Sequence, residues 1–265
     1  LFISWVGPRG IVAAGIASLF GSKLLKSGVE GAEYITPLVF MIVLGTVLLN
    51  ATTARLFAKV VGVFLTSSDG ILIVGASPAS RLIASYLKQN GRRVVLIDSN
   101  SDHIKKAEEM ELESIEASVY DDDLTENIEL NDVGYLMSLT GSSVINEYAL
   151  SKFTKDFGEQ GAIRLISSEE MKNPSVRPVQ GLFSQTDDFI NLSEVVRDFP
   201  KINEVELASK EDYSTKIDTL NAEITSIPVF VKSNDGVIHI ISSNSEKMQI
   251  EKGNMLMYLG KQIEF

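Results

Sequence analysis

The pattern of hydrophobic and polar positions divides the chain into two parts. Residues 35–54, with the sequence ITPLVFMIVLGTVLLNATTA, form an apolar run of 20 residues without a charge. As a helix this run is about 30 Å long, which matches the hydrocarbon layer of a membrane. Residues 1–25 are a second, weaker candidate, because Arg9 interrupts them. We therefore expect residues 1–66 to form the last transmembrane helices of a membrane domain.

Beyond this point, short apolar runs alternate with amphipathic stretches. The first run ends at Gly75 and precedes a helical pattern over residues 79–89, and the second run ends at Asp98. A strand, a glycine turn, a helix and a second strand form a βαβ unit, and the alternation then continues. The sequence therefore predicts an α/β fold with a Rossmann-like parallel sheet over residues 67–172.

The C-terminal part has a different pattern. Residues 173–181 contain two prolines and mark a boundary. Short strand patterns then cover residues 205–208, 227–232, 237–242 and 255–259. Polar and glycine residues at positions 233–236 favour a hairpin turn between two of these strands. We expect residues 173–265 to form a small β-rich module.

The charge distribution follows the same division. The chain carries 24 basic and 35 acidic residues, a net charge of −11. Residues 1–66 hold five basic and two acidic side chains, so this part carries +3 and the remainder −14. An acidic soluble part argues against nucleic acid as its partner.

Basic residues predict the orientation in the membrane. Arg55 and Lys59 follow the apolar run directly. Because basic residues next to a span mark its cytoplasmic side, we expect a multi-pass protein of the plasma membrane with its C-terminal domain in the cytoplasm.

The first residues are unusual for a complete protein. The chain begins without methionine inside an apolar run, so we interpret it as the C-terminal part of a longer protein. A charge inside a membrane segment faces either a buried partner or the interface, which leaves both roles open for Arg9. The many small residues around it favour a helix packed inside a bundle.

The loop after the first strand is the main candidate for chemistry. Its sequence, G-A-S-P-A-S, keeps Gly75 of a G-x-G-x-x-G fingerprint and places Ser77 and Ser80 at the other two glycine positions. Asp98, 23 residues after Gly75, stands where a carboxylate accepts hydrogen bonds from ribose hydroxyls. These residues favour NAD(H) or an adenine nucleotide such as ATP or ADP over NADP. The alternative is a doubly wound domain whose site is empty.

The sequence gives little evidence for a metal site or for a reactive thiol. The chain has no cysteine, which excludes disulfides, thiolate metal sites and a thiol nucleophile. Three consecutive acids, Asp121 to Asp123, suit the first turn of a helix, where they complement the helix dipole. We expect no metal site, and we interpret His103 as a solvated helix residue and His239 as half-buried in a strand.

Two motifs resemble known families. W-V-G-P-R-G-I-V-A-A at residues 5–14, followed by a long last span, resembles the end of the membrane domain of NhaP-type monovalent cation:proton antiporters. The following part is similar to the RCK or TrkA-N type regulatory domains, whose pattern matches at Gly75, Asp98, Thr140 and Asn146. At the third strand, Ala117 and Ser118 stand where that family has Gly-Asp.

The resemblance implies several further properties. Arg9 would pair with an acidic residue on a core helix in the N-terminal remainder of the transporter, where the ion-binding carboxylates would also lie. Gly75, Asp98 and Thr140 would contact the nucleotide. RCK-like domains usually pair, so a homodimer is expected.

Our first hypothesis is therefore a sodium or potassium:proton antiporter with a cytoplasmic nucleotide-sensing domain, and not an enzyme. A membrane-tethered NAD-dependent oxidoreductase is the first alternative, but neither histidine lies in a recognisable catalytic pattern. The second alternative is a regulatory subunit of a potassium channel or uptake system. That reading would require a pore-filter sequence or a soluble subunit, and residues 1–66 show neither.

Overall fold

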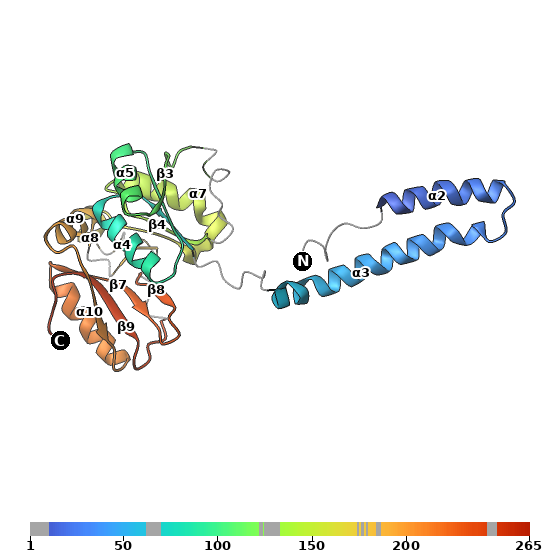
Figure 1. The fold of residues 1–265 in the computed structure, drawn as a ribbon. Coiled ribbons are helices and arrows are strands. Elements are labelled where there is room, and N and C mark those ends of the chain that lie inside the picture. The colour runs from blue at the N-terminus through green and yellow to red at the C-terminus, as the bar shows by residue number, and fades with distance from the viewer. Residues whose placement is uncertain are drawn as a thin grey trace. The chain divides into compact units, whose positions relative to one another are not determined.

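The structure, a computed structural model, forms two compact units, Leu1–Thr66 and Ser67–Phe265. Figure 1 shows the elements of each unit. The structure describes residues 11–61, 70–121, 124, 133–173, 175, 178, 180–183, 187–242 and 248–265.

The first unit is a helical hairpin. Helix α2 (Ile11–Lys26) and helix α3 (Ile35–Val61) lie side by side and are joined by the short 3-10 helix η1 (Ala32–Tyr34) (Figure 1). The helices approach closely at Gly21, where an added Cβ would lie 2.7 Å from Thr36 Oγ1. That hydroxyl donates a hydrogen bond to the carbonyl oxygen of Ala17 at 3.4 Å. A glycine therefore permits the tightest contact of the hairpin.

One helix in the described part of the chain is long and apolar enough to cross a membrane. It covers Ala32–Ala54, has a mean hydropathy of 2.0 in its most apolar window, and none of that window is buried. Large apolar side chains of both helices are exposed, among them Val12, Leu19, Phe20, Met41, Ile42 and Leu48. The span expected over residues 35–54 thus coincides with this helix. The multi-pass arrangement stays a prediction, because the second expected span begins outside the described residues.

The second unit contains a parallel sheet with the strand order β3-β2-β1-β4-β5. Its strands are β1 (Gly70–Val74), β2 (Val94–Asp98), β3 (Glu113–Glu116), β4 (Val133–Ser138) and β5 (Ala162–Arg164). The connecting helices are α4 (Pro78–Gln89), α5 (Ser101–Glu109), α7 (Ser143–Gly161) and, after the last strand, α8 (Ser168–Lys172). The predicted Rossmann-like α/β arrangement is confirmed.

The central strand explains why the hydrophobic pattern was so clear. All five residues of β1 are buried. Ile71 and Ile73 belong to the core on one face, whereas Leu72 and Val74 belong to the core on the other face, beneath α7. A strand covered on both faces shows a continuous apolar run instead of alternation.

An antiparallel sheet follows, with the strand order β6-β9-β7-β8. Its strands are β6 (Ile202–Glu206), β7 (Ser226–Lys232), β8 (Ile238–Ile240) and β9 (Met255–Gly260), and helices α9 (Phe189–Asp198) and α10 (Lys210–Ala222) accompany it. The predicted β-rich pattern is therefore present, together with two helices, α9 and α10, that the hydrophobic pattern did not predict.

The misplaced elements have physical reasons. Strand β6 starts three residues before the predicted 205–208. The hydrophobic pattern did not show this start, because the buried residue there is the polar Asn203, whose side-chain amide donates a hydrogen bond to the Gly260 carbonyl oxygen at 2.9 Å. Helix α10 is mostly polar and covers the sheet with only three apolar residues: Tyr213, Ile217 and Leu220. So narrow a stripe gives a weak helical pattern.

The two sheets share one hydrophobic core. Tyr86 on α4 stacks on Phe230 of β7, with 6.2 Å between the ring centroids, and donates a hydrogen bond to Glu204 of β6 at 2.6 Å. Helix α9 packs against α4, β7 and β9. Residues on both sides of the expected boundary at 172/173 thus belong to one continuous cluster.

Candidate functional site

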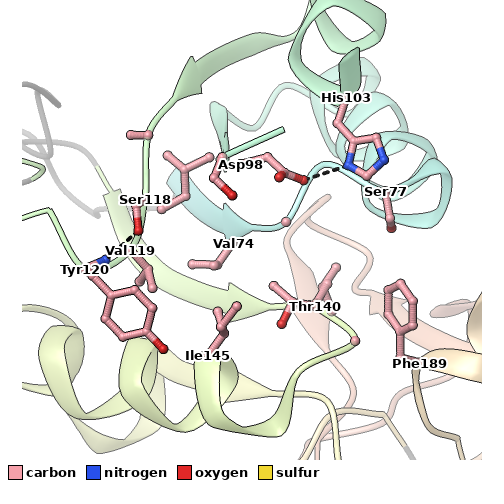
Figure 2. A pocket seen from close by; sticks show the side chains of 16 residues that line it. Val74, Ser77, Asp98, His103, Ser118, Val119, Tyr120, Thr140, Ile145 and Phe189 are labelled. Carbon is pink, nitrogen blue, oxygen red and sulfur yellow. Dashed lines mark hydrogen bonds and ion pairs between the residues drawn. The ribbon is translucent and has the colours of Figure 1, made fainter. Parts of the chain in front are cut away.

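A cavity of about 260 Å³ lies where strands β1, β2 and β4 end (Figure 2). Its lining residues are Val74, Gly75, Ser77, Ile97, Asp98, Ser99, His103, Ala117, Ser118, Val119, Tyr120, Leu139, Thr140, Gly141, Ile145 and Phe189. In open α/β sheets, ligands bind outside the carboxyl ends of the strands, at the point where the strand order reverses. Strand β1, flanked by β2 and β4, is that point here.

Gly75 is required by both conformation and space. Its φ of 97° lies in the left-handed region that side chains disfavour. An added Cβ would also lie 3.1 Å from Thr140 Cγ2 and 3.3 Å from the Leu139 carbonyl oxygen. The ends of β1 and β4 therefore approach closely because this position is glycine.

The two serines of the loop have different positions. Ser77 lines the cavity and caps α4, its Oγ accepting a hydrogen bond from the Ser80 N–H at 3.2 Å. Ser80 is completely buried, does not line the cavity, and its hydroxyl lies 3.0 Å from that of Ser77. The structure thus brings Ser77 to the site and places Ser80 beneath it. Direct contact of Ser80 with a ligand stays a prediction.

Asp98 holds the site together. Its Oδ2 accepts hydrogen bonds from the Ala76 N–H at 2.7 Å and from His103 Nδ1 at 2.9 Å, and its Oδ1 accepts one from the Asn100 N–H at 2.9 Å. Burial alone would raise the pKa of Asp98, but these hydrogen bonds outweigh burial and lower it. The side chain therefore stays an anion that already links the glycine loop to the end of β2.

Thr140 and Asn146 form a clamp at the end of β4. Asn146 Oδ1 accepts from the Thr140 N–H at 3.1 Å, from Thr140 Oγ1 at 2.7 Å and from Ser138 Oγ at 2.9 Å. Its Nδ2 donates to the Thr140 carbonyl oxygen at 3.0 Å. Because Asn146 is buried and Thr140 lines the cavity, the amide positions the loop and does not face a ligand.

The third side of the cavity is the loop after β3. Its backbone carries Ala117 and Ser118, the two positions that depart from the RCK pattern. The ammonium group of Lys152 on α7 supports the loop by donating to the Val119 carbonyl oxygen at 3.0 Å and the Asp121 carbonyl oxygen at 2.5 Å. The Tyr120 ring packs on Tyr148 with 4.5 Å between centroids.

Among the residues that the structure describes, the cavity lining carries one carboxylate, one imidazole and no lysine or arginine. Arg81 lies outside this lining, is buried, and donates to the Ala76 carbonyl oxygen at 2.5 Å. Burial lowers the pKa of Arg81, and the charge of Asp98 partly opposes this effect. A phosphate at the loop would therefore meet backbone N–H groups: within the described chain, those of Ser77 and Ala79 have no hydrogen-bond partner.

Two lining residues were missed from the sequence. His103 lies on helix α5 with a side chain that is 37% exposed, as expected, but the sequence did not show that its Nδ1 bonds Asp98 and that it lines the cavity (Figure 2). Its position five residues after Asp98, in the first turn of the next helix, was the available signal. Phe189 comes from α9, in the part expected to be a separate module, and no local pattern pointed to it.

Other expectations fall elsewhere. Arg9, Asp122 and Asp123 lie outside the residues that the structure describes. Where the chain is described, no group of three histidine, aspartate or glutamate side chains is placed to hold a metal ion.

Comparison with known proteins identifies part of the chain. Residues 71–173 match the family model of the TrkA-N domain, so the chain contains a TrkA-N domain. No curated protein matched the chain.

Three solved structures were also similar. The NAD(P)-binding domain of an exopolyphosphatase-related protein from Archaeoglobus fulgidus is 18% identical, with 40% of this chain and 92% of that chain covered and a TM-score of 0.30. The GsuK RCK domain is 12% identical, with 73% of this chain and 44% of that chain covered and a TM-score of 0.33. The GsuK channel bound to NAD is 14% identical, with 86% of this chain and 45% of that chain covered and a TM-score of 0.36. The present chain therefore spans less than half the length of either GsuK chain.

Proposed function

We propose that this chain is the C-terminal portion of a monovalent cation:proton antiporter, and that its TrkA-N domain binds NAD(H) or another adenine nucleotide in the cytoplasm and thereby regulates transport. The observation that carries the nucleotide part is the cavity at the switch point, where Gly75 and Asp98 lie together. The antiporter part rests on the motif at residues 5–14 and on the exposed apolar helix that follows it.

The lining suggests how a nucleotide would lie. An ionised carboxylate offers about four acceptor sites, and three of those on Asp98 are occupied by protein donors. One site on Oδ1 remains for a ribose hydroxyl. Phosphates would then lie over the Gly75 turn, against the unpaired N–H groups at the start of α4. A 2′-phosphate would meet the negative charge of Asp98, so NADP should bind more weakly than NAD.

Regulation requires that the nucleotide prefer one arrangement of the domain. A ligand shifts an equilibrium between two transporter states only by its difference in affinity for them. The domain would act on transport through the helix that precedes it, and in the assembled transporter as a homodimer. We propose no catalytic role for the domain.

Binding to the whole chain in detergent tests the proposal. We expect NAD+, NADH, ATP, ADP or AMP to bind by calorimetry, and Asp98→Ala to weaken that binding by about ten-fold or more, as the loss of a charged hydrogen bond predicts. Asp102→Ala is the matched control, because this exposed carboxylate is four residues away and does not line the cavity. Binding that Asp98→Ala leaves unchanged would contradict the ribose placement, and no binding at all would overturn the sensing function.

Transport tests the second half of the proposal. In vesicles, cation/proton exchange by the full-length transporter should respond to the nucleotide that binds, and the response should shift to higher concentration in Asp98→Ala. Exchange that ignores the nucleotide would mean that the domain does not regulate it.

A further inference from the structure

Phe189 brings the C-terminal part of the chain into the nucleotide cavity. It is the first residue of α9, which Asp188 caps by accepting hydrogen bonds from the Ile190 and Asn191 N–H groups at 3.0 Å each. The half-buried ring lies on Gly141, where an added Cβ would be 3.0 Å from Phe189 Cδ1 and 3.2 Å from Cε1. Gly141 has no unusual φ, so it is space for this ring that favours glycine there.

The strand order places Phe189 on a defined side of the cavity. Asp98 follows β2, Gly75 follows the central β1, and Thr140 and Gly141 follow β4. A ligand with a ribose at Asp98 and phosphates over Gly75 would therefore continue toward the β4 side, where Figure 2 shows Thr140 and Phe189. There it meets the face of the cavity formed by Leu139, Gly141 and Phe189.

We propose that Phe189 stacks on the planar ring of the second nucleoside of a dinucleotide, so that this site selects a dinucleotide over AMP, ADP or ATP. The inference rests on the proposed nucleotide function and specifies its ligand. A mononucleotide that uses Asp98 and the Gly75 turn has no ring left for Phe189. An aromatic ring on an aromatic side chain contributes affinity because both faces are apolar and polarisable.

The same residue connects the ligand to the second sheet. Leu192, Val195 and Val196 of α9 are buried in the core shared by both sheets. The Val195 side chain lies against Gly260 of β9, where an added Cβ would be 2.9 Å from Val195 Cγ1. A ring that orders Phe189 therefore also orders α9 against the antiparallel sheet.

Ligand truncation combined with substitution tests this inference on the whole chain in detergent. We compare NAD+ with ADP-ribose, which lacks only the nicotinamide ring, and with AMP. Phe189→Leu keeps an apolar side chain and should weaken NAD+ binding by about 5- to 150-fold, the range for loss of one base–aromatic stack. It should leave ADP-ribose and AMP within about two-fold. Phe189→Tyr should retain affinity, and Gly141→Ala, which displaces the ring, should act like Phe189→Leu.

The control and the contradicting outcomes are distinct. Ile190→Ala alters the exposed neighbour, which does not line the cavity, and should change nothing. Equal weakening of NAD+ and ADP-ribose by Phe189→Leu would overturn the stacking role, as would wild-type NAD+ affinity no higher than that of ADP-ribose. If AMP binding depends on Asp98 but not on Phe189, and NAD+ binds no more tightly than AMP, the preference for a dinucleotide is contradicted while the proposed nucleotide-sensing function still holds. Absence of all nucleotide binding would reject both.

Hydrogen exchange gives an independent readout. NAD+ should slow amide exchange in α9 and in β9 of the wild-type chain, and this protection should be lost in Phe189→Leu under saturating NAD+. Protection confined to the glycine loop in both proteins would show that Phe189 does not transmit occupancy to the second sheet.

Discussion

At the scale of single residues, the buried charges of the second unit are held by defined partners. Arg164, at the end of β5, is 6% exposed at its side chain and forms a two-point pair with Glu170 of α8, with Nη2–Oε1 at 2.6 Å and Nη1–Oε2 at 2.9 Å. The hydrogen bond from Arg164 lowers the pKa of Glu170 to about 2, although burial acts in the opposite direction. The pair joins the last strand of the parallel sheet to the helix that leads to α9.

Acid should therefore destabilise the domain through Glu170. Its folded pKa of about 2 lies below the ordinary 4.5, so its contribution is complete above about pH 4.5 and disappears as the pH falls toward 2. The difference corresponds to about 3 kcal/mol. Glu170→Gln should lower the free energy of unfolding by about 3 kcal/mol at pH 7 and flatten its pH dependence between 4.5 and 2, as measured by urea denaturation.

The adjacent Glu169 supplies the control, because it is exposed and forms no pair with Arg164. Glu169→Gln should change stability at pH 7 by less than about 0.5 kcal/mol. Equal effects of the two substitutions would show that the Arg164–Glu170 pair does not stabilise the fold.

At the scale of elements, side-chain caps and close contacts decide where helices begin and how they meet. Ser77, Asn100, Ser142, Asp188 and Ser209 each cap a helix by accepting a backbone hydrogen bond. Such caps are local and were available from the sequence. Contacts between helices were not, because they depend on which faces meet in space.

The α2–α3 hairpin gives the clearest test at this scale. Gly21→Leu should separate the two helices, because even a Cβ would lie 2.7 Å from Thr36 Oγ1. The chain has no cysteine, so a single Ala32→Cys thiol, at a position only 3% exposed, reports on the contact. Gly21→Leu should raise its rate of maleimide labelling in detergent several-fold.

Gly15→Leu is the matched control on the same helix, because an added Cβ there meets no atom within 4 Å. Its labelling rate should equal that of the parent. If Gly15→Leu raises labelling as much as Gly21→Leu, close packing at Gly21 is not what protects position 32.

At the scale of the whole molecule, the two units differ in how much apolar surface they expose. The second unit has hydrophobic cores on both faces of each sheet. The hairpin leaves many large apolar side chains exposed, a surface typical of a contact with a membrane or with another protein. Lipid, or the helices of a larger membrane domain, would cover them.

The chain should consequently fractionate with membranes and resist extraction by alkaline carbonate. The double substitution Leu44→Asp and Val47→Asp should release the chain from membranes into the carbonate extract. Both positions are exposed within the apolar helix, at 60% and 51%, and each charge near a helix centre raises the free energy of membrane insertion by about 3 kcal/mol. Val29→Asp, in the turn of the hairpin, should have no effect. Release of the unaltered chain by carbonate would contradict membrane insertion.

The sequence by itself determined the features that depend on neighbouring residues. The continuous apolar runs of β1 and β2, the turn at Gly75 and the acid at the end of β2 placed a Rossmann-like unit correctly, because strands buried on both faces and glycine turns have local patterns. The apolar helix within residues 32–54 was equally clear, since length and lack of charge suffice to recognise it.

Only the tertiary structure decided which of these residues act together. It showed that Asp98 already binds Ala76 and His103, that Asn146 clamps Thr140, and that Phe189 enters the cavity from a part of the chain expected to be separate. It also joined the two sheets into one core through α4 and α9. These outcomes depend on contacts between residues far apart in the chain, and no local pattern of hydrophobic and polar positions encodes the partner of a buried polar group.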